Sequence, residues 1–313
     1  MDAIEIVTAT DEAFVRQLAV ALASISTNCS EPCRVRVLHD GVPPAARDRV
    51  EGARRDHVDV EWIDARPVVD GHVLPAGNPR PTFFRLFLAE LLPDDRGRVV
   101  YLDADIVVRH SLRPLWETSL DGAAVGAVRD AYRPWMVRND TFSWRDVGVA
   151  PDAPFFNSGV MLVDLDQWRR RDVGARSLAL LSEQSRMFDQ CALNIVHEHE
   201  WKALEPVWNV QSYHLFGDEC LAFATEGRDR LDAAVRDPAV VHFTGGSFNR
   251  PWQAPCGNPF RDEWLAYLDQ TPWRGWRPEP TPPLVRAWGR TQRALGVLRH
   301  GGGRDARSRA GDA

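Results

Sequence analysis

Apolar and polar positions follow two different rhythms along the first part of the chain. Short apolar runs at 4–8, 34–39 and 58–63 predict three strands. Between them, 14–27 carries apolar residues three or four positions apart and 44–55 is a second such stretch, so both are predicted to be helices. Alternation of this kind is typical of an α/β fold with a largely parallel sheet.

The middle of the chain extends this pattern and interrupts it with two loops. Further strands are predicted at 99–102, 124–128 and 155–164, and further helices at 82–92, 165–187 and 188–196. The loop 67–81 is rich in Pro and Gly, and 132–154 is irregular and rich in Trp and Phe, which is typical of a functional loop. No internal repeat or linker interrupts the chain before residue 270, so we expect one domain over 1–270.

The composition changes in the last part of the chain. Residues 271–313 are rich in Trp, Pro and Arg, and within them Leu284, Trp288 and Leu295 follow a helical spacing with arginines mostly off that stripe. We expect a partly helical, basic extension whose end is disordered. The helix could lie on a membrane surface or pack on its own domain, and the sequence leaves both open.

Overall composition narrows the function classes. The 313 residues carry a formal net charge of −6, which argues against a nucleic-acid partner. No apolar run approaches the roughly 20 residues that span a bilayer, and the N-terminus lacks the features of a signal peptide. The five cysteines show no zinc-binding spacing and fit free thiols in a reducing compartment. We therefore expect a cytoplasmic protein.

Two carboxylates, Asp103 and Asp105, directly follow the apolar strand 99–102. Unpaired charge at the end of a buried strand is costly, and a divalent cation with oxygen ligands offsets that cost. Residues i and i+2 of a strand face the same side, so both carboxylates could reach one ion if the extended geometry continues through Ala104. Alternatively, the pair is two turn carboxylates that bind nothing.

A second polar cluster lies far downstream, at the end of another apolar run. His242 is followed by Gly245 and Gly246 and then by Arg250. Glycines let a backbone approach a phosphate closely, and a guanidinium binds phosphate through charge-assisted hydrogen bonds. His242 is a candidate third metal ligand, the alternative being a histidine that is satisfied within the core. Together the two clusters predict a metal–diphosphate site.

Several short motifs occur in order between residues 4 and 270. They are IVTATD at 6–11, FRL at 84–86, YLDAD at 101–105, Gly126–Ala127 with Asp130, FNSGV at 156–160, Asp189–Gln190 with Asn194, and Trp208–Asn209. In order and spacing they resemble glycosyltransferase family 8, retaining enzymes that include bacterial lipopolysaccharide galactosyl- and glucosyltransferases and glycogenin. The resemblance implies that 1–270 is one catalytic domain with the GT-A fold, a Rossmann-like mixed sheet flanked by helices.

The chain departs from the family pattern at two positions. The last family signature is H-x-x-G-x-x-K-P-W, but Arg250 replaces the lysine, and it lies two residues too far along if Gly245 is the matching glycine. If Gly246 is the matching glycine instead, part of the discrepancy in spacing lies between His242 and that glycine. Arginine and lysine differ in reach and geometry. Ala13 also replaces a family asparagine near Asp11.

The resemblance implies a UDP-sugar donor, with glucose or galactose as the hexose, and a divalent cation, Mn²⁺ or another such as Mg²⁺. Asp103, Asp105 and His242 would hold the ion, which would neutralise charge on the departing UDP. The implied donor contacts are Ala9 and Asp11 to uracil, Asp103 to ribose, Arg250 with Gly245 and Gly246 to the diphosphate, and Arg85, Asn157, Asp189 and Gln190 around the sugar.

The catalytic roles also follow from the resemblance. Gln190 would stabilise the oxocarbenium-like centre and Asp189 would orient the sugar hydroxyls. An amide is a poor nucleophile, so we favour a same-face retaining mechanism over a double displacement through a carboxylate. Without the family context, Asp189 and Gln190 would be interpreted as a helix N-terminus with an acid favoured by the helix dipole.

The acceptor is expected along the loop 132–154. Asp130 could hydrogen-bond an acceptor hydroxyl, and Trp135, Phe142 and Trp144 could stack on sugar or aglycone faces. The alternative for each aromatic is structural packing. A carbohydrate, a glycolipid and a small molecule all remain open as acceptors.

Two other functions remain as alternatives. A nucleotidyltransferase also uses a carboxylate-held metal, but the expected Gly-rich loop after the first strand is absent from 9–13. A non-catalytic nucleotide-sugar-binding protein is disfavoured by the intact Asp103, Asp105 and His242, and kept open by Arg250. A basic tail would fit a location at the inner face of the membrane.

Overall fold

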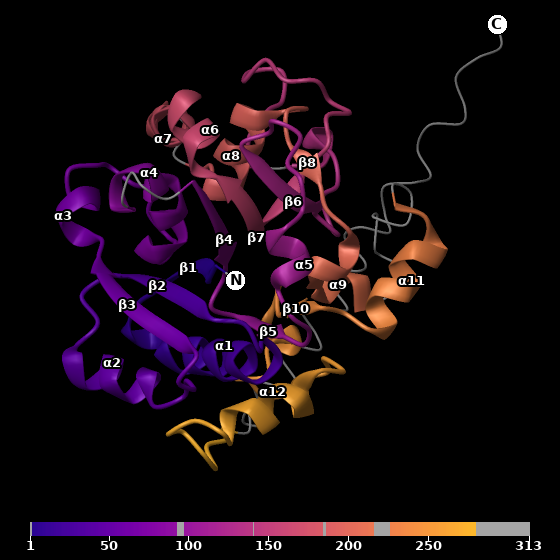
Figure 1. Ribbon diagram of the computed structural model, residues 1–313. Coiled ribbons are helices and arrows are strands. Elements are labelled where there is room, and N and C mark those ends of the chain that lie inside the picture. The colour runs from indigo at the N-terminus through magenta and orange to yellow at the C-terminus, as the bar shows by residue number, and fades with distance from the viewer. Residues whose placement is uncertain (1, 93–96, 140, 184–185, 216–225, 280–313) are drawn as a thin grey trace, which may run out of the picture.

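The computed structural model describes residues 2–279 apart from 93–96, 140, 184–185 and 216–225, and contains two sheets (Figure 1). The larger has seven strands in the order β3-β2-β1-β4-β7-β6-β8, and the smaller has three in the order β5-β10-β9. The strands are β1 Ile4–Thr10, β2 Cys33–His39, β3 Val58–Asp64, β4 Arg98–Leu102, β5 Ile106–Val108, β6 Val125–Arg129, β7 Phe156–Asp164, β8 Lys202–Ala203, β9 Val210–Gln211 and β10 Val240–His242.

The large sheet is parallel in one half and mixed in the other. Strands β3, β2, β1 and β4 run parallel, with Ile6 opposite both Val35 and Val100. Strand β7 then runs antiparallel to both β4 and β6. The predicted alternation is confirmed for 4–63. The expectation of a largely parallel sheet is also confirmed, because β8 pairs parallel to β6 and only β7, which enters between β4 and β6, runs against the other six strands.

Helices cover both faces of the large sheet (Figure 1). The helices within the described residues are η1 Glu12–Phe14, α1 Val15–Asn28, α2 Pro44–Glu51, α3 Arg66–Val69, η2 Arg80–Phe87, α4 Leu88–Leu91, α5 Arg113–Trp116, η3 Met136–Arg138, α6 Leu165–Arg170, α7 Val173–Glu183, α8 Asp189–His197, η4 Pro206–Trp208, α9 Ser212–Leu215, α11 Arg228–Arg236, η6 Ser247–Asn249 and α12 Arg261–Leu268. One apolar core lies between the sheet and α1 with α12, and the other between the sheet and η2, α4, α6, α7 and α8.

Asp11 caps the short helix that follows β1. Asp11 Oδ1 accepts a hydrogen bond from the backbone N–H of Phe14 at 3.1 Å and so caps η1, which leads directly into α1. Leu18, Leu22 and Ile25 of α1 are all buried in the first core. The periodic apolar pattern of 14–27 therefore marks the helix face that packs on the sheet.

Two predicted helices differ from those observed. The stretch 82–92 is mainly the 3-10 helix η2, and Pro81 withholds one backbone donor from its first turn. The predicted helix 165–187 breaks between α6 and α7 at Asp172, whose φ is 49°. The break brings α7 against η2 so closely that a Cβ on Gly174 would lie 2.3 Å from the carbonyl oxygen of Leu86.

The start of the C-terminal extension packs on the domain. The guanidinium of Arg16 lies 3.8 Å from the ring centroid of Trp276, and that of Arg49 lies 4.2 Å from the ring centroid of Trp273. The predicted basic helix beyond residue 283 lies outside the described residues. Within the described part, no helix is long and apolar enough to cross a bilayer.

Candidate active site

Asp103 and Asp105 lie where the chain passes from the large sheet to the small one. Strand β4 ends at Leu102 and β5 begins at Ile106, with a turn at Ala104 and Asp105 between them. The expectation that extended geometry continues through Ala104 is therefore wrong. The two carboxylates converge because the chain turns between two sheets.

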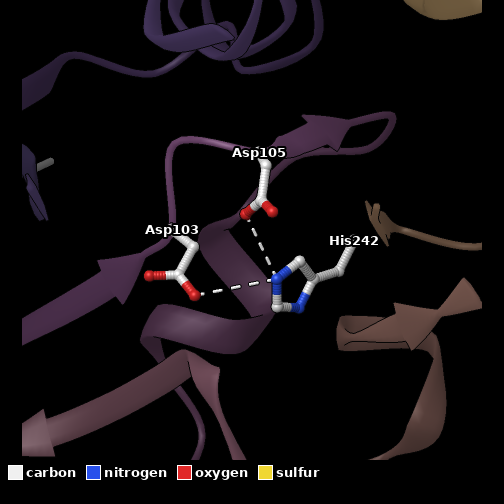
Figure 2. Close-up of side chains that lie close together, drawn as sticks. All are labelled: Asp103, Asp105 and His242. Atoms are coloured by element: carbon white, nitrogen blue, oxygen red, sulfur yellow. Dashed lines mark ion pairs between the residues drawn. The ribbon is translucent and has the colours of Figure 1, made fainter. Parts of the chain in front are cut away.

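His242 completes this cluster from the last position of β10. Its Nε2 lies 3.2 Å from Asp105 Oδ1 and 3.7 Å from Asp103 Oδ2, and Figure 2 shows the three side chains pointing toward one another. One ligand atom from each residue lies within 4.8 Å of the others. Two carboxylates and an imidazole form a donor set that suits Mn²⁺ and related divalent ions. The described residues thus contain a candidate Asp-Asp-His metal centre, which consists of the three ligands predicted from the sequence.

The electrostatics of the cluster match this chemistry. Burial opposes the imidazolium form of His242, but the nearby charges of Asp105 and Asp103 outweigh burial and raise its pKa. Burial works to raise the pKa of Asp105, yet the charge of His242, their hydrogen bond and the charge of Arg250 lower it. The carboxylates therefore create a negative site that attracts positive charge, either a proton on His242 or a cation.

Gly159 of β7 closes one side of the metal centre. A Cβ on Gly159 would lie 2.1 Å from His242 Cε1 and 2.7 Å from Asp103 Oδ2. The backbone of the same residue accepts a hydrogen bond from the N–H of Asp103 at 2.8 Å. Any side chain at position 159 would collide with His242, which gives a steric reason for the glycine of the FNSGV motif.

The buried side chain of Arg85 contacts several residues next to the candidate metal centre. Its Nη2 donates to Asp103 Oδ1 at 2.8 Å, and its Nε lies 2.9 Å from Asp189 Oδ2. Its Nη1 donates to the carbonyl oxygen of Ser158 at 2.6 Å, and its guanidinium lies 4.7 Å from the ring centroid of Tyr101. Burial would lower the pKa of Arg85, but these anionic neighbours raise it. Arg85 therefore holds Asp103 and Asp189 in fixed positions.

Asp189 begins α8 and is itself buried. Its side chain is 5% exposed, and burial raises the pKa of this carboxyl in spite of the ion pair with Arg85. Arg85 also forms an ion pair with Asp103, so one positive charge compensates two carboxylates. A partly compensated buried carboxylate is a feature of functional sites.

Asp130, Asn157 and Gln190 form one hydrogen-bonded cluster. Asp130 Oδ2 accepts from Gln190 Nε2 at 3.1 Å and from Asn157 Nδ2 at 3.3 Å. The other end of the Gln190 amide, Oε1, accepts from the backbone N–H of Ser158 at 3.1 Å. Both ends of Gln190 are thus occupied, which fixes the plane of its amide.

A cavity of about 350 Å³ opens beside the metal centre. Its wall contains Ala9, Thr10, Asp11, Phe14, Asn78, Pro79, Pro81, Thr82, Arg85, Tyr101, Asp103, Ala104, Asp105 and Arg250. The predicted donor residues at the tip of β1 and around the two carboxylates therefore share one cavity. The other residues predicted to bind the donor lie outside its lining, as does His242: Asn157, Asp189, Gln190, Gly245 and Gly246.

A short helix lies in the segment of unusual spacing before Arg250. The 3-10 helix η6 lies between Gly246 and Arg250, and Trp252 packs edge-on against Phe14 and Phe243. Arg250 thereby reaches the cavity wall. Its Nε is buried and has no hydrogen-bond partner among the described residues, so this donor is available to a ligand.

For two of the aromatic residues beyond Asp130, the structure favours the packing alternative. Phe142 is 8% exposed and belongs to the core, and Trp144 packs against that core. Instead, Tyr132 is 43% exposed and stacks on Tyr213, with ring centroids 4.7 Å apart and planes at 23°. Sequence reasoning missed Tyr213, because its contact with Tyr132 joins segments far apart in the chain.

Comparison with known proteins identifies the family and agrees with the fold. A family model for glycosyl transferase family 8 matches residues 5–256, and the chain belongs to this family. The structure resembles the crystal structure of the galactosyltransferase LgtC in complex with donor and acceptor sugar analogs, with a TM-score of 0.70 and 25% identity over 91% of this chain and 99% of that one. The expected GT-A fold is thereby confirmed.

Relatives of similar sequence occur in several bacteria. General stress protein A of Bacillus subtilis is 26% identical over 278 residues, which cover 86% of this chain and 94% of that protein. The lipopolysaccharide 1,2-glucosyltransferase of Escherichia coli is 23% identical over 66% of this chain, which corresponds to 59% of that enzyme. The chain thus matches the whole of some relatives and only part of others.

Proposed function

We propose that this glycosyltransferase is a metal-dependent, retaining hexosyltransferase. It transfers glucose or galactose from a UDP-sugar to an acceptor hydroxyl. The observation that carries the proposal is the convergence of Asp103, Asp105 and His242 beside a cavity whose lining includes both aspartates, Asp11 and Arg250. A nucleoside diphosphate requires a cation site, a cavity and a guanidinium with a hydrogen-bond donor available to it.

Each part of the cavity has a task in this proposal. Ala9 and Asp11, at the tip of β1, contact the uracil, and Asp103 also reaches the ribose. Arg250 donates hydrogen bonds to the diphosphate, aided by the backbone at Gly245 and Gly246. The divalent ion, Mn²⁺ or Mg²⁺, supplies positive charge that stabilises UDP as it leaves.

The donor sugar lies against Arg85, Asn157, Asp189 and Gln190 in this proposal. A double displacement requires a carboxylate that is free to attack the anomeric carbon. Asp189 is paired with Arg85, and Asp130 accepts from two side-chain amides. These contacts support a same-face mechanism, in which Gln190 stabilises the developing positive charge and Asp189 orients sugar hydroxyls.

The acceptor approaches past Asp130 and the stacked pair Tyr132 and Tyr213. Asp130 Oδ1 accepts from the backbone N–H groups of Tyr132 and Arg133 at 3.0 and 2.7 Å, so the carboxylate and the aromatic pair are held together. An exposed aromatic face beside a carboxylate suits a carbohydrate, a glycolipid or a small metabolite with a sugar ring. Asp130 would hydrogen-bond the accepting hydroxyl.

We further propose that 1–270 is the catalytic domain of a cytoplasmic enzyme whose extension, 271–313, contacts the inner face of the membrane. The described cysteines Cys29, Cys33, Cys191 and Cys256 are free thiols, as in a reducing compartment. Co-sedimentation with anionic liposomes tests the tail. The full chain should pellet and a chain truncated after Thr281 should not, and equal pelleting would contradict the membrane contact.

A donor screen tests the proposed activity directly. The protein is incubated with Mn²⁺ and a panel of UDP-sugars, and released UDP is measured with and without simple glycoside acceptors. We expect UDP release from UDP-glucose or UDP-galactose. Binding of these donors without UDP release would favour a non-catalytic binding protein, and pyrophosphate release from UTP and a sugar phosphate would favour a nucleotidyltransferase.

A further inference from the structure

Asn209 lies directly behind the candidate metal ligand His242. The Oδ1 of Asn209 is 3.1 Å from Nδ1 of His242, the ring nitrogen that faces away from Asp105. The Nδ2 of Asn209 donates to Asn157 Oδ1 at 2.9 Å. Asn209 is fully buried, so water does not compete for either contact.

Backbone groups fix the direction of these hydrogen bonds. Asn157 Oδ1 also accepts from the backbone N–H of Gly159 at 3.1 Å, and a backbone N–H can only donate. The oxygen of the Asn157 amide must therefore face Gly159 and Asn209. It follows that Asn209 presents its NH₂ group to Asn157 and its oxygen to His242, so Nδ1 of His242 carries a proton. In the neutral ring, the lone pair then lies on Nε2, toward Asp103 and Asp105.

The same chain of bonds continues to the catalytic amide. Asn157 Nδ2 donates to Asp130 Oδ2 at 3.3 Å, and Gln190 Nε2 donates to the same oxygen at 3.1 Å. Ser158 N–H donates to Gln190 Oε1, which fixes the amide of Gln190 in the same way. All donors along this path point toward Asp130, the one anionic member between His242 and Gln190.

We propose that Asn209 is a positioning residue that serves both the metal centre and Gln190. It holds the imidazole of His242 in the tautomer and orientation that present Nε2 to a divalent cation. Through Asn157 and Asp130 it also aligns the amide of Gln190. This inference rests on the proposed function, and its experiment measures cation binding separately from turnover.

Partners of this kind behind a ligating histidine typically affect metal affinity by 10- to 100-fold. We therefore expect Asn209→Leu, which removes both hydrogen bonds, to weaken Mn²⁺ binding by roughly that factor. Asn209→Asp keeps an acceptor for His242 Nδ1 but cannot donate to Asn157. It should bind Mn²⁺ within about threefold of wild type, whereas its kcat falls more strongly because Gln190 loses its alignment.

The experiment is an electron paramagnetic resonance titration of free Mn²⁺ against each purified full-length variant, with thermal unfolding followed in parallel. Asn258→Leu is the matched control, because Asn258 is also a buried amide but contacts Ser212 and the Asn249 carbonyl rather than a metal ligand. It should lower stability and leave Mn²⁺ affinity unchanged.

Three outcomes separate the possibilities. A folded Asn209→Leu protein that binds Mn²⁺ as tightly as wild type would overturn the role of Asn209 alone. If Asn209→Leu does not fold, an Asn209→Asp protein with wild-type kcat or with strongly weakened Mn²⁺ binding would overturn it. A wild-type protein that binds no Mn²⁺ would contradict the metal centre of the proposed function itself, and this inference with it.

Discussion

The Cα of Gly159 and the imidazole ring of His242 are so close that no side chain fits between them. A Cβ on Gly159 would lie 2.1 Å from His242 Cε1, well inside van der Waals contact. These residues come from β7 and β10, which belong to different sheets. The backbone of β7 in the large sheet therefore forms a wall against the ring of His242 from the small sheet.

Gly159→Ala should displace His242 and Asp103 from this wall. We expect the variant to lose at least tenfold in Mn²⁺ affinity, because the ring must move by more than an ångström to clear the new methyl group. Mn²⁺ titration checks the effect. Gly71→Ala is the control, since a Cβ on Gly71 meets nothing within 4 Å. Wild-type affinity in Gly159→Ala would show that this wall does not determine the geometry of the site.

Mn²⁺ binding should strengthen as the pH rises from 6 to 8. Asp105 and Asp103 raise the pKa of His242, so the imidazolium persists above the usual range of a histidine. A cation must displace that proton, and its apparent affinity therefore falls as pH drops through the raised pKa. Titration of Mn²⁺ across this range measures the slope. A pH-independent affinity would argue that His242 is not a ligand.

Acid should destabilise the fold through two buried histidines. Burial lowers the pKa of His197 to about 3 and that of His214 to about 4. A histidine whose folded pKa is lowered stabilises the protein above its unfolded pKa of about 6.5 and loses that contribution as pH falls. At pH 5, each of these histidines lowers the free energy of unfolding by about 2 kcal/mol. The raised pKa of His242 acts in the opposite sense.

A variant separates the contribution of one histidine. Urea unfolding at pH 7 and pH 5 should show wild type losing about 2 kcal/mol more than His197→Leu over this interval. The exposed His72 provides the control, and His72→Gln should keep the wild-type loss. Equal losses in His197→Leu and wild type would mean that His197 titrates normally.

Arg250→Ala should weaken UDP binding in the presence of Mn²⁺ by roughly 10- to 150-fold, the range expected for a charge-assisted hydrogen bond of about 1.5–3 kcal/mol. Its Nε lacks a partner among the described residues, so the ligand would supply one. Calorimetric titration with UDP measures the change. Arg250→Lys should recover part of the affinity, and Arg261→Ala, at an exposed ion pair with Asp262, should not alter it.

Local patterns predicted the first half of the fold well. The runs at 4–8, 34–39 and 58–63 became β1, β2 and β3, and 14–27 became α1, since each signal lies within one element. The antiparallel entry of β7 and the departure of β5 into a second sheet depend on pairings between distant segments. No periodicity along the chain encodes those pairings.

The candidate site was likewise predicted only in part. Asp103, Asp105 and His242 were predicted as one group and lie together, although a turn at Ala104 rather than an extended strand brings the carboxylates together. The role of Asn209 could not be predicted, because it depends on contacts with both Asn157 and His242. The family motif Trp208–Asn209 was the one available signal.

UDP release by wild type and by Asp105→Ala tests the central claim most directly. With Mn²⁺ and the preferred UDP-hexose, wild type should release UDP and lose this activity when EDTA removes the ion. Asp105→Ala should show neither turnover nor a response to Mn²⁺, while Gly71→Ala should match wild type. Wild-type activity in a folded Asp105→Ala protein would contradict the metal-dependent mechanism.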